Sequence, residues 1–390
     1  MTAEAAADAF DKTTLLSQLL HQHPWYALAL ITLGFIGGTI SGFIGSGGAF
    51  LMTPGMMNLG IPGIMAVGAN ITHKFGKAMM GQKKHGQLGH VDRRLGLFLL
   101  VTSLAGIRVA VMVNEFFYER LGDAGSNLYV STFFVLTLSI IGYFIMRDAI
   151  RSLRGRGGPA SRKLQHRFRK LNLPPTIYFK TANVRVSVIM LIIVGFCVGF
   201  MAGTIGVGGF IGVPAMIYLF GIPTVVATGT ELFLAMFMGA FGALNYGAEG
   251  FVDIRITLLL FAGSMVGLFV GSIGTKMVRE VYIRTVTGAL ILLCTVSRAL
   301  AIPDYLRTLH YIHVGTQMIH RLEVTSAVVL FTSGIGSTVF ILYFVLRAHL
   351  RQLHVFRRYR AAIEAPETVQ GTSDSSPAEL PDNSALPHSQ

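Results

Sequence analysis

The amino-acid sequence predicts an all-α, polytopic membrane protein of about 8–9 transmembrane helices. These form two homologous, inverted repeats, each with a glycine-rich re-entrant or broken hairpin. Three observations lead to this fold class. Only 13% of the 390 residues are charged, against about 25% in an ordinary soluble domain. Apolar runs of about 18 residues or more, long enough to cross the hydrocarbon layer as a helix, recur along the chain. The chain also matches itself at a fixed offset. A soluble globular protein is therefore excluded.

Nine apolar runs are candidates for membrane-spanning helices. In the first half they cover residues 26–45, 64–82, 95–114 and 128–146, and in the second half 185–205, 224–245, 256–275, 285–302 and 324–346. Two more apolar stretches, 49–59 and 210–221, are too short to cross a bilayer alone. Each short stretch directly follows a longer run, so we expect it to belong to a hairpin.

Charge and composition divide the chain into six regions: an N-terminal segment (1–25), a first transmembrane repeat (26–146), a basic linker (147–184), a second repeat (185–302), a loop with an additional helix (303–346) and a tail (347–390). Ten Lys and Arg lie between Arg147 and Lys180, and five between Arg347 and Arg360. Basic segments beside membrane helices are typically cytoplasmic. We therefore expect a cytoplasmic linker, with room for one basic helical piece, and a cytoplasmic tail that is basic and then disordered.

The two halves are related by an offset of 161 residues, at which residues 34–106 align with 195–267 without a gap. The matched pairs include glycines but also other types: Gly42/Gly203, Gly48/Gly209, Pro62/Pro223, Ala66/Ala227, Asp92/Asp253 and Arg94/Arg255. Glycine bias alone does not produce aligned Pro, Asp and Arg. The sequence therefore predicts an internal duplication.

The orientation of the repeats follows from the charges. If the basic linker and the basic tail are both cytoplasmic, an even number of crossings must separate them. The four clear runs after residue 223 already satisfy this condition, so residues 185–221 form a hairpin that enters the membrane and returns, and residues 26–59 form its counterpart. The repeats are then inverted. If each hairpin were instead one broken spanning helix, the repeats would be parallel and the tail external.

Glycine-rich turns mark the two hairpin tips, Gly45-Ser46-Gly47-Gly48 and Gly206-Val207-Gly208-Gly209. Irregular backbone at membrane depth survives where it is buried in protein or lines a wet cavity. Free N–H groups and helix N-termini at such a turn can bind an oxyanion. The alternative is that the glycines only permit a tight turn and close packing, and the two interpretations are compatible. We expect Gly45, Ser46, Gly47, Gly48, Thr204, Gly206, Gly208 and Gly209 to bind substrate.

Polar and ionisable residues follow each hairpin inside the next apolar run. Asn70, His73 and Lys74 lie in the first repeat, and Thr230 and Glu231 lie in the second, with Asn70 aligned to Glu231. Ionisable residues within a span are costly and often functional. We expect Asn70 and Thr230 to bind substrate, and Glu231, His73 and Lys74 to couple transport to protons or ions. Alternatively, Glu231 is a packing carboxylate paired with Lys74 or Arg108. Lys77 is expected to extend toward the cytoplasmic edge.

Several functions and partners are excluded or disfavoured. The net charge of +13 lies in membrane-flanking segments without an aromatic-basic module, so nucleic acid is not an expected partner. The glycine-rich turns lack the Lys-Ser/Thr ending of a nucleotide-binding loop. Only two cysteines occur and the histidines of the predicted external loop lack ligand-spaced neighbours, so neither a metal nor a cofactor is expected. A small-residue stripe (Gly263, Gly267, Gly271) fits either internal helix packing or a homodimer face.

The paired motifs resemble the TauE/SafE family of sulfite exporters and related anion permeases. The resemblance rests on G-x-x-x-G-x-x-G-x-G-G, present as Gly38 to Gly48 and Gly199 to Gly209, each followed by Gly-Ile-Pro (60–62, 221–223), Ala-x-Gly (66–68, 227–229) and an Asp loop (89–92, 250–253). It covers about residues 28–302. It implies a bacterial inner-membrane transporter of about eight helices in two homologous halves, whose members are linked to export of sulfite, sulfonates or related anions. The basic linker, the last helix and the tail are additions to that pattern.

The sequence therefore predicts a multi-pass inner-membrane secondary transporter, and not an enzyme, for a small anion. Sulfite or an organosulfonate is the expected cargo, moving outward and coupled to protons. A passive anion channel is the alternative. A membrane enzyme or assembly factor would require convergent His, Asp or Cys groups on one face of the bilayer, and the sequence offers none beyond the three loop histidines.

Overall fold

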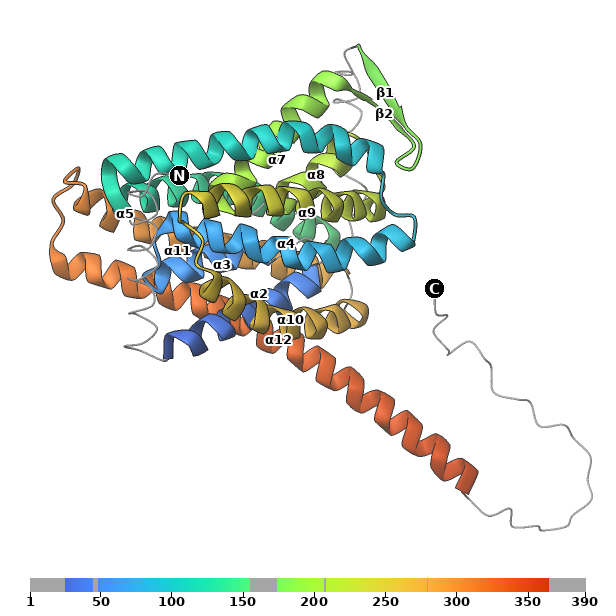
Figure 1. Ribbon diagram of the computed structural model, residues 1–390. Coiled ribbons are helices and arrows are strands. Elements are labelled where there is room, and N and C mark those ends of the chain that lie inside the picture. Colours follow the sequence, from blue (N-terminus) through green and yellow to red (C-terminus); the bar gives the residue numbers. More distant parts are fainter. Residues whose placement is uncertain (1–24, 45–47, 155–173, 207, 279, 365–390) are drawn as a thin grey trace, which may run out of the picture. The chain divides into compact units, whose positions relative to one another are not determined.

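The computed structural model describes residues 25–44, 48–154, 174–206, 208–278 and 280–364. Its helices are α2 (Trp25–Ile44), α3 (Ala49–Asn58), α4 (Gly63–Gln87), α5 (Arg93–Leu153), α7 (Val188–Ile205), α8 (Gly209–Tyr218), α9 (Thr224–Ala248), α10 (Ile254–Met277), α11 (Glu280–Thr308) and α12 (Thr316–Glu364) (Figure 1). Two short strands, β1 (Thr176–Phe179) and β2 (Val184–Ser187), precede α7. The chain forms two compact units, residues 1–346 and 347–390. The tail beyond residue 364, expected to be disordered, lies outside the described residues.

Seven helices of the described chain are long and apolar enough to cross a membrane, which confirms the all-α, polytopic class. One of the seven, α5, contains two of the predicted runs. Gly122 interrupts it with φ 64° and ψ −157°. The Ser126 hydroxyl donates to Asn114 Oδ1 over 3.0 Å, whereas twelve residues of straight helix would separate the two by about 18 Å. The chain therefore folds back at Gly122, and α5 supplies two antiparallel legs.

The basic linker contains elements that the sequence did not predict. Residues 147–153 continue α5, and β1 and β2 pair as an antiparallel hairpin. Residues 155–173, where the predicted basic helical piece could form, lie outside the described residues. The strand sequences Thr-Ile-Tyr-Phe and Val-Arg-Val-Ser are dominated by β-branched and aromatic residues, which favour strands. Asn183 turns the chain between them with φ 52°.

The element boundaries repeat at the same offset of 161 residues as the sequence. Residues 63–87 form α4, and residues 224–248, their counterparts, form α9. Asp92 caps the start of α5 and Asp253 caps the start of α10. Left-handed glycines mark the same turns in both halves, Gly60 with Gly221 and Gly89 with Gly250.

Each repeat packs its first helix against the other repeat. A Cβ on Gly38 of α2 would lie 2.3 Å from the Ser264 carbonyl oxygen of α10, and one on Gly199 of α7 would lie 1.9 Å from the Ser103 carbonyl oxygen of α5. These two contacts are equivalent under the offset, since 38 corresponds to 199 and 103 to 264. Such reciprocal contacts are those of a two-fold relation. Gly263, Gly267 and Gly271 face the backbone of α2 in the same way, so this small-residue stripe is used for internal packing.

The contact between α4 and α9 shows how the two halves are oriented. A Cβ on Gly242 would meet Ile71, one on Gly239 would meet Phe75, and Gly81 faces Leu232. Residue numbers rise along α4 as they fall along α9, so the helices run antiparallel (Figure 1). Because they are the same element of the two repeats, this contact favours inverted over parallel repeats.

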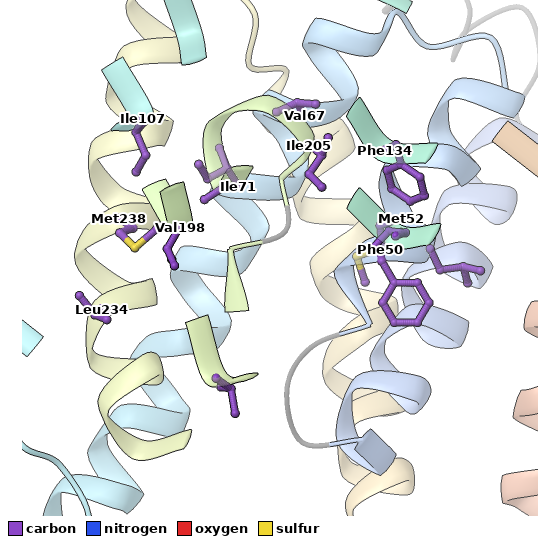
Figure 2. Packing of buried hydrophobic residues seen from close by; sticks show 14 of the residues in the cluster. Phe50, Met52, Val67, Ile71, Ile107, Phe134, Val198, Ile205, Leu234 and Met238 are labelled. Atoms are coloured by element: carbon purple, nitrogen blue, oxygen red, sulfur yellow. The ribbon is translucent and has the colours of Figure 1, made fainter. Parts of the chain in front are cut away.

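Apolar side chains fill the space around the hairpin tips. Phe50 and Met52 of α3, Ile205 of α7, Ile71 of α4 and Met238 of α9 are all buried (Figure 2). Within a bilayer, close packing and dispersion contribute more to such contacts than the exclusion of water does. The polar site residues predicted on α4 and α9 are therefore surrounded by apolar side chains.

Candidate functional site

Each hairpin is broken at the predicted glycine-rich turn. In the second repeat α7 ends at Ile205, Gly206 adopts φ 76°, and α8 begins at Gly209 with Gly208 as its N-cap. In the first repeat α2 ends at Ile44, and α3 begins at Ala49 with Gly48 as its N-cap. Neither N-cap glycine has a side chain that could accept a hydrogen bond from the first N–H groups of its helix, so each helix start keeps its partial positive charge. The predicted site residues Gly45, Ser46 and Gly47 lie outside the described residues.

A polar stripe lies along α4 between the two hairpins. It consists of Asn70, His73, Lys74 and Lys77, spaced as one face of a helix. Asn70 is fully buried and His73 nearly so. Thr72, outside the stripe, donates to the Gly68 carbonyl of its own helix. α4 is not among the seven apolar helices, since these charged residues interrupt its apolar sequence.

Lys74 and Glu231 form an ion pair beside the start of α8. The Lys74 Nζ atom lies 3.6 Å from Glu231 Oε1, and the side chains are 17% and 5% exposed. Among the described residues, neither the Lys74 ammonium nor the Glu231 carboxylate has a hydrogen-bond partner at ordinary distance. A Cβ on Gly208 would lie 3.3 Å from Lys74 Nζ, and one on Gly212 would lie 2.3 Å from Glu231 Oε2. The two side chains are therefore buried in contact with the N-terminal turn of α8, and their charged groups are farther apart than in a hydrogen-bonded ion pair.

Asn70 contacts the glycine-rich turn of the second hairpin, both directly and through Thr53. Its Nδ2 donates to Thr53 Oγ1 over 2.8 Å, and the Thr53 hydroxyl donates to the Ile205 carbonyl over 3.2 Å. A Cβ on Gly206 would approach Asn70 Nδ2 to 2.9 Å. Glycine is thus required at 206 both for its left-handed φ and for this close approach. Side chains of the first repeat therefore provide hydrogen bonds to the backbone at the C-terminal end of α7 in the second repeat.

His73 and Lys77 lie on the side of α4 that faces α2 and α10. The His73 ring meets Phe261 of α10 edge-on at 6.0 Å between ring centres, and neither ring nitrogen has a hydrogen-bond partner in the described structure. The Lys77 ammonium donates to Ser41 Oγ of α2. Lys77 therefore points inward toward the first hairpin, and the expectation that it extends to the cytoplasmic edge was wrong.

Two predicted substrate-binding hydroxyls are bonded within the protein. Thr204 Oγ1 lies 3.1 Å from the Tyr129 hydroxyl, and Thr230 Oγ1 accepts from the Asp92 N–H over 3.1 Å. Thr204 thus anchors the end of α7, and Thr230 ties α9 to the start of α5.

Arg108, the alternative partner considered for Glu231, instead contacts residues near the end of α9. It donates to Asn245 Oδ1 over 3.1 Å and lies 4.0 Å from Glu249. Of the two cations that the sequence offered as partners, the structure brings Lys74 to Glu231.

Several residues of the site escaped sequence reasoning: Ser41, Thr53, Gly212, Tyr129 and Tyr246. Tyr246 donates to the Gly203 carbonyl over 2.7 Å and so satisfies the end of α7. A usable signal existed for Ser41 and Thr53, which are hydroxyl residues within one or two turns of the glycine-rich tip. Gly212 had none, because its role depends on a side chain of another helix.

The comparisons with known proteins agree with this architecture. The family model described as "Sulfite exporter TauE/SafE" matches residues 30–298. A "Probable membrane transporter protein YunE" of Bacillus subtilis is 25% identical over 269 residues, covering 66% of this chain and 90% of that protein. A second Bacillus subtilis protein, "Probable membrane transporter protein YjnA", is 26% identical over 248 residues (63% and 89%). A "Probable membrane transporter protein" of Xylella fastidiosa is 28% identical over 254 residues (63% and 83%). No solved structure matches the chain with comparable significance.

Proposed function

Because the chain belongs to the TauE/SafE sulfite exporter family of membrane transporters, we propose that it is a proton-coupled secondary transporter that exports a small oxyanion, sulfite or an organosulfonate. It works as a multi-pass protein of the bacterial inner membrane, with the basic linker and tail on the cytoplasmic side. The Lys74–Glu231 pair at the start of α8 is the observation that carries this proposal.

Lys74 can serve either Glu231 or a transported anion. With Glu231 ionised, the ammonium is neutralised from 3.6 Å away. An arriving oxyanion competes for the same ammonium and for the uncapped N-terminus of α8. Protonation of Glu231 removes its negative charge, so the Lys74 ammonium can then pair with the substrate anion. Proton binding and anion binding at this site therefore favour each other, which is the linkage that a coupled transporter requires.

The inverted repeats supply the conformational step. Each broken hairpin packs on a helix of the opposite repeat, α2 on α10 and α7 on α5. Rocking of one such pair against the other, around a site near the bilayer midplane, would expose the tips to the two sides in turn. Because the anion leaves together with the proton on Glu231, the membrane potential acts on their net charge. An interior-negative potential of 100 mV drives a sulfite dianion with one proton outward by about 2.3 kcal/mol, whereas a monovalent sulfonate with one proton is not driven by the potential.

The test is sulfite flux in proteoliposomes with the membrane potential clamped to zero. Flux into vesicles should saturate with sulfite and respond to an imposed pH gradient. Glu231→Gln should abolish the response to the pH gradient while retaining sulfite exchange at equal concentrations. Glu249→Gln, which removes a carboxylate from the end of α9, is the matched control and should behave like the wild type.

A passive anion channel predicts the opposite pattern. Its flux would rise in proportion to sulfite without saturation and would not change in Glu231→Gln. That result would overturn both the coupling mechanism and the assignment of the chain as a secondary transporter.

A further inference from the structure

Lys77 is an ammonium without a carboxylate partner in the described structure. Its Nζ donates to the Ser41 hydroxyl, and among the described residues no Asp or Glu oxygen forms an ion pair with it, whereas Lys74 and Arg108 each have one. A cation within a membrane-spanning bundle is expensive unless a negative group accompanies it. The hydroxyl provides an acceptor but no charge. Within the part of the chain that the structure describes, the site thus contains a cation that no carboxylate neutralises.

The position of Lys77 mirrors that of Lys74 with respect to the hairpins. Lys74 lies beside Gly208, the N-cap of α8. Ser41, the partner of Lys77, lies beside Gly48, the N-cap of α3, since a Cβ on Gly48 would lie 2.9 Å from the Ser41 amide nitrogen. One helix, α4, therefore carries two lysines three residues apart on the same face: Lys74 lies beside the start of α8, and Lys77 bonds the residue of α2 that lies beside the start of α3.

The two lysines differ in what holds them. Glu231 neutralises Lys74 until the carboxylate is protonated, while a neutral hydroxyl holds Lys77. An oxyanion can therefore bind Lys77 without first displacing a carboxylate. His73 lies one turn before Lys77 on the same side of α4, is buried, and has both ring nitrogens without a hydrogen-bond partner in the described residues. It adds a further donor or acceptor for an anion at this position.

We propose that Lys77 is a substrate-binding residue, which anchors the oxyanion at the first hairpin before Lys74 is released at the second. This inference rests on the proposed function and extends it. The anion first occupies the Lys77 position beside the start of α3. It then engages Lys74 as well once Glu231 is protonated, so that both hairpins hold it during the conformational change.

The test compares the KM for sulfite among charge variants of position 77 in proteoliposomes. A hydrogen bond to a charged group is worth about 1.5–3 kcal/mol, so Lys77→Met should raise KM by about tenfold or more. Lys77→Arg keeps the charge and should stay within a few-fold of the wild type. Lys83→Met, which removes an exposed lysine near the end of the same helix, is the control for loss of charge alone and should leave KM unchanged.

A purely structural role, in which Lys77 only fastens α4 to α2, makes a different prediction. Lys77→Gln keeps a side-chain donor for the Ser41 hydroxyl but has no charge, so a structural role predicts that it stays close to the wild type, whereas anion binding predicts that it loses as much as Lys77→Met. An unchanged KM in Lys77→Met, or a wild-type KM in Lys77→Gln, overturns the inference while the proposed function stands. Absence of saturable sulfite flux in the wild type overturns the proposed function itself.

Chemical rescue keeps the test valid if Lys77→Met folds poorly. The variant Lys77→Cys, made in a background with Cys197 and Cys294 replaced, is treated with 2-bromoethylamine, which alkylates the thiolate with loss of bromide and restores a positive charge through a thioether that sulfite does not cleave. The same folded protein is thus measured before and after. Recovery of the lower KM on modification supports the inference, and unchanged KM after complete modification contradicts it.

Discussion

The substitution Gly212→Ala tests whether the geometry around Glu231 is what the site requires. A Cβ at 212 would lie 2.3 Å from Glu231 Oε2 and 3.1 Å from its carboxyl carbon. Contacting heavy atoms are favourable at about 3.5–4.0 Å, so the carboxylate must move by about 1 Å or more. Movement of this size is enough to change its 3.6 Å separation from Lys74.

Two opposing terms set the expected change in stability. Gly→Ala within α8 should gain about 1 kcal/mol from helix propensity, and overpacking of a filled interior costs about 1–3 kcal/mol. The net result is a destabilisation of up to about 2 kcal/mol. Gly336→Ala in α12 is the matched control, because nothing lies within 4 Å of a Cβ there, and it should gain stability.

Thermal unfolding in detergent and sulfite flux under a pH gradient measure the two consequences together. Gly212→Ala should melt below Gly336→Ala and lose most of the response to the pH gradient. If Gly212→Ala melts with the control and keeps its full response, Glu231 does not occupy the position that we describe, and the reasoning built on the Lys74–Glu231 pair fails.

Three further substitutions test the scaffold around the site. Tyr246→Phe leaves the Gly203 carbonyl without its 2.7 Å donor and should lower the free energy of unfolding by about 1–3 kcal/mol, whereas Tyr343→Phe on the exposed face of α12 should have no effect on thermal unfolding. Asp92→Ala removes the α5 cap and the acceptor of the Ala182 N–H, so it should speed tryptic cleavage at Lys180. Asp253→Ala removes only a cap and should leave that cleavage rate unchanged. Gly38→Leu places a side chain into the α10 backbone and should abolish the monodisperse peak in size-exclusion chromatography, which Gly336→Leu should retain.

The duplication made most of the fold predictable from the sequence. A gapless offset transfers element boundaries from one half to the other: α4 and α9 obey it at both ends, and α3 and α8 differ from it by one residue. The hairpin of β1 and β2 escaped prediction because it lies in the part of the chain without a counterpart. Four-residue strands in a basic segment also carry little periodic signal.

The site was predictable in composition but not in pairing. Lys74 and Glu231 stood out as ionisable residues in apolar runs, yet the choice between Lys74 and Arg108 as the partner of Glu231 depends on how α4 and α9 cross. The hydroxyls of Thr204 and Thr230 were predicted to face substrate. Their partners, Tyr129 and the Asp92 backbone, lie on α5 and at its N-cap, more than 70 residues away in the sequence. The sequence identifies which polar groups are costly to bury, but only the packing of the helices shows which hydrogen-bond or ion-pair partners they have.

The scaffold of the two repeats is symmetric, whereas the charges placed on it are not, and this contrast bears on the proposed coupling. The two hairpins and their helix starts are equivalent under the offset. The charges are not: Lys74 and Lys77 correspond to Ala235 and Met238, and Glu231 corresponds to Asn70. Two copies of Glu231 would place two carboxylates where we propose that the anion binds, and two copies of the lysine pair would leave four cations with too few partners. Divergence at these positions leaves one carboxylate and two cations between two equivalent hairpins, so that in the proposed mechanism protonation of a single group decides when both hairpins hold the anion.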